Sequence, residues 1–152
     1  MRLLALGVLL LAGLVCSGDA GAQAPQVSVQ NAWSRATPPH ASTGVIYLTL
    51  TSANDDRLIG ASSPVAERAE LHETTMDGGI MRMRPVEGGL ELPAGKPVTL
   101  GPGGAHIMLT GLKTPLRQGQ SVPVHLMFAR AAPADVQAKV QAIGATGPAA
   151  PR

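Results

Sequence analysis

Glycine and proline interrupt this chain so often that long helices have little room to form. The 152 residues include 18 Gly and 13 Pro, which separate short apolar segments along the chain. Gly and Pro are the strongest local breakers of regular structure, and short apolar segments between them are typical of strands. We find no stretch of helical period of useful length. The sequence therefore predicts an all-β fold, an antiparallel sandwich of many short strands in a single domain.

Nine strands are predicted from these apolar segments and from the turns between them. They cover residues 27–35, 43–52, 56–62, 68–74, 80–86, 97–100, 105–112, 121–131 and 136–142. Asp77-Gly78-Gly79 predicts a tight hairpin turn between the fourth and the fifth strand. Because the chain has a single Trp, Tyr and Phe, we expect a core built from Val, Leu, Ile and Ala.

The first residues have the pattern of a secretory signal peptide. A basic second residue precedes the uncharged apolar run 3–15, and Ala20-Gly21-Ala22 forms an A-x-A cleavage signal. The apolar run is too short for a stable transmembrane helix. We therefore predict a signal peptide at 1–22, a folded domain at 23–143, a disordered tail at 144–152 and a periplasmic location.

Cys16 is the only cysteine, and it lies within the predicted signal peptide. Acylation of Cys16 as a lipoprotein is an alternative, but Leu14 and Val15 before it fit a lipidation signal poorly. In either case the mature chain has no thiol and no disulfide. This excludes a blue-copper electron carrier, because that site needs a thiolate beside its two histidines.

Composition excludes two further classes of protein. The net charge is only +2, charged residues make up 14% of the chain, and no run of Lys or Arg occurs, so nucleic-acid binding has no support. After the leader, no segment is long and apolar enough to span a membrane. We expect a monomer that does not bind membranes.

The chemistry of the chain is concentrated in four residues, His72, Met83, His106 and Met108, spaced as His–x10–Met–x22–His–x–Met. Imidazole and thioether together are ligands for a soft ion, and thioether sulfur selects Cu(I) over hard cations. Residues two apart on a strand share a face, so His106 and Met108 should point the same way. The predicted hairpin turn should bring His72 close to Met83. Four neutral ligands would surround Cu(I) roughly as a tetrahedron.

Several other residues have two possible roles. Met81 shares a strand face with Met83 by alternation, so it either packs beside the site or binds metal. Met76 precedes the turn and could be a flexible secondary sulfur. His125 and Met127 repeat the His–x–Met spacing, and we interpret them as strand packing rather than a second site. His40 follows two prolines and is expected in a surface loop.

The charged and aromatic neighbours of these residues also leave alternatives open. Glu73 follows His72 and could orient that imidazole, although such carboxylates are more often simply solvated. Arg82 and Arg84 alternate with methionines, which indicates a solvated face or a contact with an acidic partner. Trp33 belongs either to the core or to the surroundings of the site.

In these four residues and their spacing the chain resembles the periplasmic copper chaperones of the PCuAC family. That family has the signature His–x10–Met–x21–His–x–Met. The similar stretches are 31–39, 43–50, 69–76, 79–86 and 103–112. The first spacing agrees and the second is one residue longer, for which the glycines at 88 and 89 are the natural place, since an addition in a turn should not move the ligands.

The resemblance implies a cupredoxin-like antiparallel Greek-key sandwich that binds Cu(I) through His72, Met83, His106 and Met108. It also implies delivery of copper to the binuclear copper centre of cytochrome c oxidase, either directly to subunit II or through a thioredoxin-like copper chaperone. Some members carry a His- and Met-rich tail that adds a Cu(II) site. This chain has neither residue type after position 127, so we expect no such site.

Three other functions compete with that of a copper carrier. A metal enzyme would need an acid–base pair or an activated nucleophile, and the sequence shows neither, so we expect no catalysis. A structural or adhesive secreted β-sandwich module would leave the clustering of His and Met unexplained. A periplasmic copper buffering or resistance protein would use the same ligands with a different destination.

Overall fold

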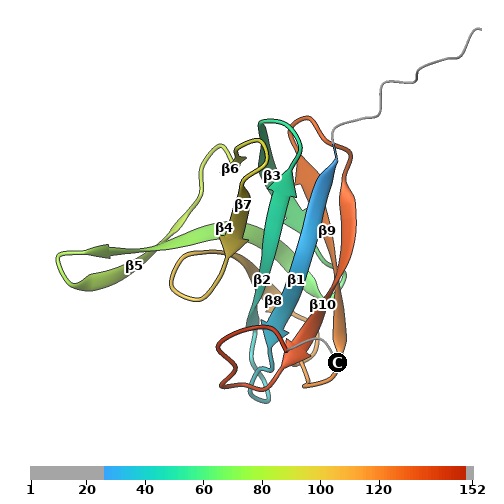
Figure 1. The fold of residues 1–152 in the computed structure, drawn as a ribbon. Helices are drawn as coiled ribbons and strands as arrows, with labels where there is room; N and C mark the ends of the chain where they lie inside the picture. The colour runs from blue at the N-terminus through green and yellow to red at the C-terminus, as the bar shows by residue number, and fades with distance from the viewer. Residues whose placement is uncertain (1–25, 150–152) are drawn as a thin grey trace, which may run out of the picture.

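The structure, a computed structural model, describes residues 26–149 and contains ten strands and no helix in that range (Figure 1). The all-β prediction is confirmed. The strands are β1 (Val27–Arg35), β2 (Thr43–Ser52), β3 (Asp56–Ser62), β4 (Ala66–Asp77), β5 (Ile80–Pro85), β6 (Leu90–Leu92), β7 (Pro97–Leu100), β8 (Ala105–Leu112), β9 (Ser121–Phe128) and β10 (Ala134–Gln141).

The strands form one continuous sheet that curves back on itself. Neighbouring strands follow the order β5-β4-β8-β2-β1-β10-β9-β3-β6, and β7 pairs with β2. The sheet closes because β3 also pairs with β4, through Ala61 and Ala69. Closure removes most free strand edges, which are otherwise prone to pair with other chains. The result is a flattened barrel, a sandwich with strands β5, β6 and β7 outside the closed ring.

Most predicted strands agree with the structure, and the differences have physical reasons. Strand β4 is longer than predicted, because it continues past the closed sheet to pair with β5. The short strand β6 was not predicted, since three residues carry too little pattern. The pairing of β1 with β10 is parallel, whereas every other strand pair described is antiparallel. The predicted antiparallel sandwich therefore has one parallel pair.

The core lies between the two walls of the sandwich and is aliphatic, as predicted. Its largest fully buried side chains are Ile46, Leu48, Leu50, Leu58, Leu92, Leu100, Ile107, Leu109, Leu116, Val122, Val124 and Leu126. On β8, Ile107 and Leu109 enter this core. Successive side chains of a strand point to opposite faces, so His106 and Met108 lie on the outer wall.

A β-bulge in β1 changes which side of the wall its residues face. Before the bulge Val29 pairs with the core residue Leu50, whereas after it Trp33 pairs with Tyr47. Asn31 has a φ of 52° at this register shift, a left-handed conformation that Asn tolerates better than most residues. An extra residue in one strand reverses the alternation after it. Trp33 is thereby placed on the face of β1 opposite to the aliphatic cluster, where it is still buried, 4% exposed, against Tyr47.

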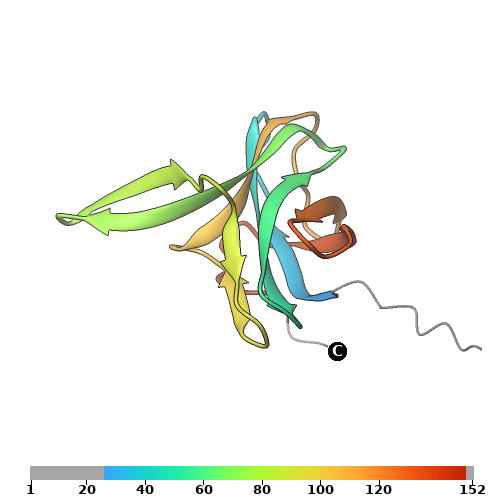
Figure 2. The ribbon, with the colours of Figure 1, turned by 90° about the horizontal axis from the view of Figure 1, so that it is seen from above.

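The hairpin of β4 and β5 projects from the body of the sandwich as an arm (Figures 1 and 2). The two strands are joined by Gly78 and Gly79, whose φ angles are 58° and 81°. A two-residue turn with positive φ at both positions matches the twist of antiparallel strands, and glycine adopts it without steric cost. The tight turn predicted at Asp77-Gly78-Gly79 is confirmed.

The start of β3 depends on one carboxylate. Asp56 Oδ1 accepts hydrogen bonds from the backbone N–H groups of Arg57 at 2.7 Å and Arg130 at 2.9 Å, and Oδ2 accepts one from Ala131 at 2.8 Å. Burial alone would raise the pKa of Asp56, but these bonds and the nearby Arg130 charge lower it below its usual value. The ionised carboxylate therefore connects β3 to the loop after β9.

Replacing Asp56 by Asn should lower the free energy of unfolding at pH 7 by about 1–3 kcal/mol, the usual worth of hydrogen bonds to a charged group. A lowered folded-state pKa stabilises the folded protein fully above the unfolded value, near 4, and less as pH falls through the folded value. The difference between wild type and variant should thus shrink in acid. Urea unfolding from pH 7 to pH 2.5 measures it, with exposed Glu87→Gln as the control; a pH-independent difference would contradict this assignment.

The two ends of the chain are described only in part. The signal peptide predicted at 1–22 lies outside the described residues, so it stays a prediction, as do the domain limits. Beyond residue 143, the Ala145 carbonyl accepts a hydrogen bond from Arg35 Nε at 2.6 Å, and Ala145 N–H donates to the Ala142 carbonyl at 3.0 Å. No helix between residues 26 and 149 could cross a membrane.

Candidate metal site

Two histidines lie opposite each other on the face of the sheet that points away from the aliphatic core. In the antiparallel pair of β4 and β8, His72 is directly opposite His106, and Glu70 is opposite Met108. Directly opposite residues share a face of the sheet. The imidazole centroids of His72 and His106 are 6.1 Å apart with the rings tilted by 42°. The predicted ligands His72, His106 and Met108 are therefore brought together on one face.

The tautomer of His106 is fixed by its surroundings. Its Nδ1 lies 2.9 Å from the Gly104 carbonyl oxygen. A carbonyl only accepts hydrogen bonds, so Nδ1 carries the proton and Nε2 is left with its lone pair. The same carbonyl accepts a bond from the backbone N–H of Thr74 at 3.2 Å, which ties the loop before β8 to β4. A backbone partner on one ring nitrogen is the usual way that a metal-binding imidazole is oriented.

Two imidazole nitrogens in this place are buried without a partner. Among the residues that the structure describes, four buried side-chain polar atoms lack a hydrogen bond: Ser52 Oγ, His72 Nδ1, His106 Nε2 and Thr110 Oγ1. Leaving such a group unpaired costs about 1–3 kcal/mol. His106 as a whole is only 4% exposed. A bound cation would satisfy both imidazoles, so the residues present fit a metal ion held by His72 and His106.

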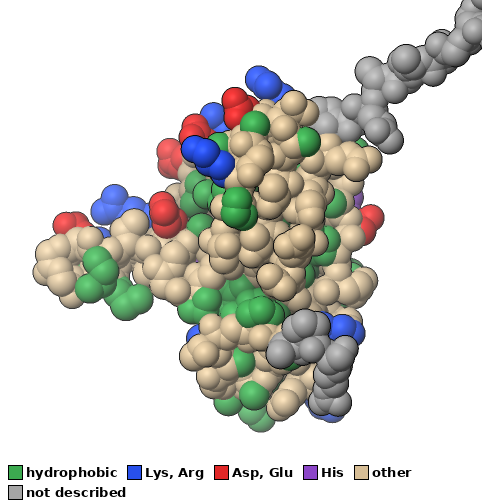
Figure 3. Space-filling view, viewed as in Figure 1, with side chains coloured by type: hydrophobic (Ala, Val, Ile, Leu, Met, Phe, Trp, Pro, Cys, Tyr) green, Lys and Arg blue, Asp and Glu red, His purple; other side chains and the backbone are tan. Residues whose placement is uncertain are grey.

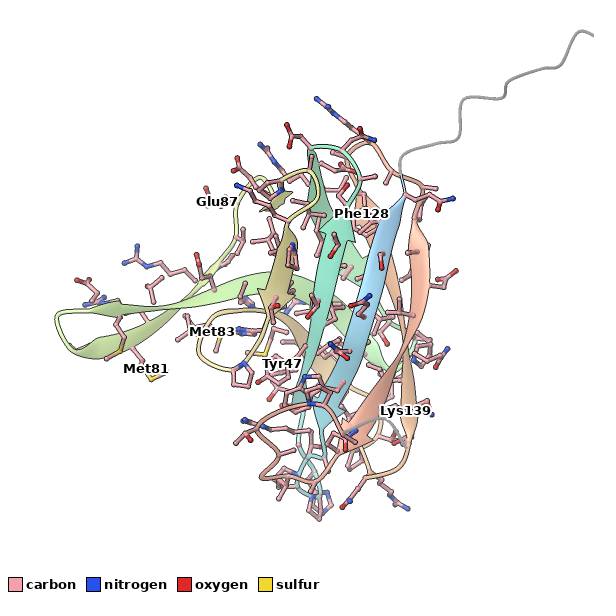
Figure 4. The ribbon with its side chains drawn as sticks, in the orientation of Figure 1. Tyr47, Met81, Met83, Glu87, Phe128 and Lys139 are labelled. Atoms are coloured by element: carbon pink, nitrogen blue, oxygen red, sulfur yellow. The ribbon has the colours of Figure 1, made fainter. Side chains whose placement is uncertain are left out.

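Met83 reaches the same face from the arm. On the β4–β5 pair, Thr74 is opposite Met83 and His72 is opposite Pro85. Met83 is thus the diagonal neighbour of His72, and diagonal neighbours are about 7–8 Å apart, within reach of a long side chain. The Met83 side chain is 50% exposed. In Figure 4 it lies between Met81, nearer the tip, and the body of the sandwich.

The face that carries His72, His106 and Met108, the ligand face, continues with aromatic side chains on the body of the sandwich. Val45 on β2 is opposite Met108, and Tyr47, two residues further, shares its face. The rings of Tyr47 and Trp33 pack at 4.7 Å, and Arg35 lies 5.9 Å above the Tyr47 ring. Burial raises the pKa of the Tyr47 hydroxyl, partly offset by Arg35. Trp33 is thus a buried residue, as one of its two expected roles requires, and its contact with Tyr47 places it beside the face that carries Met108.

The carboxylate next to His72 in sequence does not share its face of the sheet. Glu73 is opposite Arg84 and Ala105, on the reverse face from His72, so it cannot orient that imidazole. The carboxylate on the ligand face is Glu70, two residues before His72, exposed and opposite Met108. Strand alternation from His72 could have identified Glu70. A negative charge there favours a cation on this face.

The second His–x–Met pair is used differently. His125 and Met127 lie on β9, which pairs with β10 and β3 and not with the strands that carry His72 and His106. His125 Nδ1 bonds to Asp135 Oδ1 at 2.7 Å, and Met127 packs over Gly60, where a Cβ would approach its methyl to 2.9 Å. Met127 therefore packs within its sheet, as predicted, whereas His125 pairs with a carboxylate. His40 is in an exposed turn, also as predicted.

The remaining candidate sites in the described part of the chain lack the ligands that a soft ion such as Cu(I) prefers. Within residues 26–149, no three His, Cys, Asp or Glu side chains come together as a metal cluster, although structural zinc sites are built from those residues. A surface hollow beside β3 and β6 is lined by charged and aliphatic residues with no His or Met. Of its three carboxylates, Asp55 and Asp56 accept hydrogen bonds from backbone N–H groups, and Glu91 forms a salt bridge of 3.5 Å with Arg57.

Comparison with known proteins gives matches in sequence and in structure. The family described as "Putative lipoprotein LpqE-like" matches residues 27–140. A relative from Leifsonia xyli subsp. xyli, "Putative lipoprotein Lxx21020", is 38% identical over 108 residues. These residues make up 71% of this chain and 65% of the relative, so the chain spans less than two thirds of that protein's length.

Solved structures share the fold. The solution structure of the Cu(I) form of DR1885 from Deinococcus radiodurans has a TM-score of 0.62 and 38% identity, covering 82% of this chain and 85% of that one. The apo form has a TM-score of 0.59 and 34% identity, covering 93% and 95%. A copper-bound PCuAC domain from PmoF2 has a TM-score of 0.64 over 78% and 95%, and at 22% identity it shows the fold alone. The chain therefore belongs to the LpqE-like family and has the cupredoxin-like fold of PCuAC domains.

Proposed function

We propose that this protein is a Cu(I) carrier that binds one ion through His72, Met83, His106 and Met108. The observation that carries the proposal is the pair of buried, unpartnered nitrogens, His72 Nδ1 and His106 Nε2, on the face that also holds the two methionines. Copper is the cargo in this account, and no catalytic step is involved. The Cu(I)-bound structure of DR1885, 38% identical, supports the choice of ion.

The ligand set suits a carrier in an oxidising compartment. Two imidazoles and two thioethers are neutral, so the bound ion keeps its charge of +1. Without thiols the site cannot be lost to disulfide formation, although its methionines can be oxidised to sulfoxides. Neutral ligands also release copper more readily to a thiolate acceptor than a cysteine site would. These properties favour reversible transport over permanent storage.

The protein without metal should prefer Cu(I) to Zn(II). Thioethers suit the softer ion, and zinc sites in proteins are built from Cys, His and carboxylate ligands. A direct competition, with Zn(II) added in excess to the Cu(I)-loaded protein and copper followed by a chromophoric chelator, should show no displacement. Zn(II) binding of equal or greater affinity would sink the soft-site proposal.

The recipient we propose is the binuclear copper centre of cytochrome c oxidase subunit II, reached directly or through a thioredoxin-like chaperone. The exposed arm next to the ligands gives a partner access to the copper without unfolding the sandwich. Incubating the Cu(I)-loaded protein with the soluble domain of subunit II, with and without the thioredoxin-like protein, tests the transfer. A copper buffering protein would keep its ion in the presence of both acceptors.

We propose export to the periplasm with cleavage before Gln23. The printed names of the family and of the Leifsonia relative favour the alternative, acylation of Cys16, whereas Leu14 and Val15 argue against it. The intact mass of the protein recovered from the cell envelope distinguishes the two. A chain beginning at Gln23 supports the proposal, and a mass corresponding to a diacylglyceryl Cys16 would replace it.

A further inference from the structure

The arm formed by β4 and β5 exposes more methionine than the four-ligand site uses. Met76 is 69% exposed and Met81 is 64% exposed, both near the tip. Neither packs in the core, although core packing is the usual role of this side chain. Their exposure keeps flexible apolar side chains in water, so it calls for another explanation.

Strand register places these two sulfurs on the ligand face. Met76 is directly opposite Met81, and the next same-face pair toward the body is Thr74 with Met83. Alternation puts His72 on that face as well. The reverse face carries Arg82, Arg84 and Asp77, with a salt bridge of 3.4 Å from Arg82 to Asp77. Figure 3 shows the same division, with apolar side chains on one side of the arm and charged ones on the other.

The spacing along the arm makes Met83 a neighbour of His72 on one side and of Met76 and Met81 on the other. Same-face residues on a strand are about 6.6–6.8 Å apart, twice the rise per residue, so Met81 follows Met83 at one such step. Met76 is across from Met81 at about 5 Å between Cβ atoms. In Figure 4 Met81 lies further out along the arm than Met83. Three flexible thioethers can therefore converge on one ion.

We propose that Met76, Met81 and Met83 form an outer Cu(I) site through which the ion passes to and from the inner site of His72, His106 and Met108. This proposal rests on the proposed function. Three thioethers bind Cu(I), but more weakly than a set that includes two imidazoles oriented by the fold. Met83 belongs to both sites, so the ion moves by exchanging two thioethers for two imidazoles and one thioether. Copper stays Cu(I) throughout, and no proton or electron is transferred.

The test uses the full mature chain and a double substitution, Met76→Leu with Met81→Leu. Leucine keeps the apolar volume, and such swaps are well tolerated, but it has no sulfur. The matched control is Met127→Leu, a surface methionine that is 36% exposed on β9. Cu(I) supplied as its acetonitrile complex is titrated into each protein, and release to a chromophoric chelator is followed by stopped flow.

Wild type should bind one Cu(I) tightly and a second one weakly, because Met83 serves the inner site once it is filled and leaves only Met76 and Met81 for the second ion. The double variant should keep the tight site within about threefold but lose the weak one, because Leu provides no ligand. Release from its tight site should be slowed about tenfold, since tethered ligands act at effective concentrations in the millimolar range. The Met127→Leu control should match wild type in all three measurements.

The other outcomes separate the two proposals. If wild type takes up no Cu(I), both the carrier function and the outer site are wrong. If wild type binds Cu(I) tightly but the double variant shows the same second equivalent and the same release rate, only the outer site is wrong. If the double variant loses the tight site, Met76 or Met81 belongs to the inner set, which also overturns the outer site.

Discussion

Replacing His106 by Ala should weaken Cu(I) binding by about 100-fold or more. Even residues that only orient a ligand typically contribute 10- to 100-fold to metal affinity, and His106 offers a lone pair already positioned by Gly104. The substitution removes both the lone pair and its fixed direction. Competition against a chromophoric Cu(I) chelator at fixed pH measures the loss.

The matched control for this prediction is His125→Ala. His125 begins a second His–x–Met sequence, but it lies on β9 and bonds to Asp135. Its removal should leave Cu(I) affinity unchanged. Because His106 is buried, the free energy of unfolding of both variants is measured as well, so that a loss of folded protein is not mistaken for a loss of ligand. A copper loss in His125→Ala with none in His106→Ala would reverse the assignment.

Replacing Leu109 by Ala should destabilise the fold by about 2–5 kcal/mol, the usual cost of truncating a buried aliphatic side chain. Leu109 is fully buried in the aliphatic core, on the opposite face of β8 from Met108. The folded fraction should nevertheless keep its Cu(I) affinity, because the truncated side chain does not reach the outer wall. Urea unfolding and a Cu(I) competition on the same preparation measure the two effects.

The neighbouring substitution Met108→Leu should show the opposite behaviour. A swap of similar volume should cost less than about 1.5 kcal/mol of stability, while the loss of one thioether weakens Cu(I) binding strongly. Two adjacent residues of β8 would thus separate stability from binding. Equal loss of Cu(I) affinity in both variants would mean that the two faces of β8 are not divided between core and site as described.

Local pattern was sufficient to predict the parts of the site that depend on alternation and turns. The side chains of His106 and Met108 share a face because they are two apart on a strand, and Gly78-Gly79 closes the hairpin that brings Met83 to His72. The His72–His106 juxtaposition depends on the pairing of β4 with β8. Strand pairing is set by the whole topology, and nothing local in either segment specifies it.

Other features were beyond local pattern for identifiable reasons. The bulge at Asn31 reverses alternation in β1, so the face on which Trp33 is buried cannot be obtained by counting residues. Glu73 is next to His72 in sequence, but adjacent residues of a strand face opposite ways. The hydrogen bond from His106 to Gly104 depends on the shape of the glycine-rich loop before β8.

X-ray absorption at the copper edge, on protein loaded with less than one equivalent of Cu(I), tests the central claim most directly, because it counts the ligand atoms around the ion. The account predicts Cu(I) with two nitrogen and two sulfur neighbours, and one sulfur fewer in Met83→Ala. A shell of nitrogen and oxygen alone, or a spectrum unchanged by Met83→Ala, would contradict the assignment of His72, Met83, His106 and Met108 as the copper ligands.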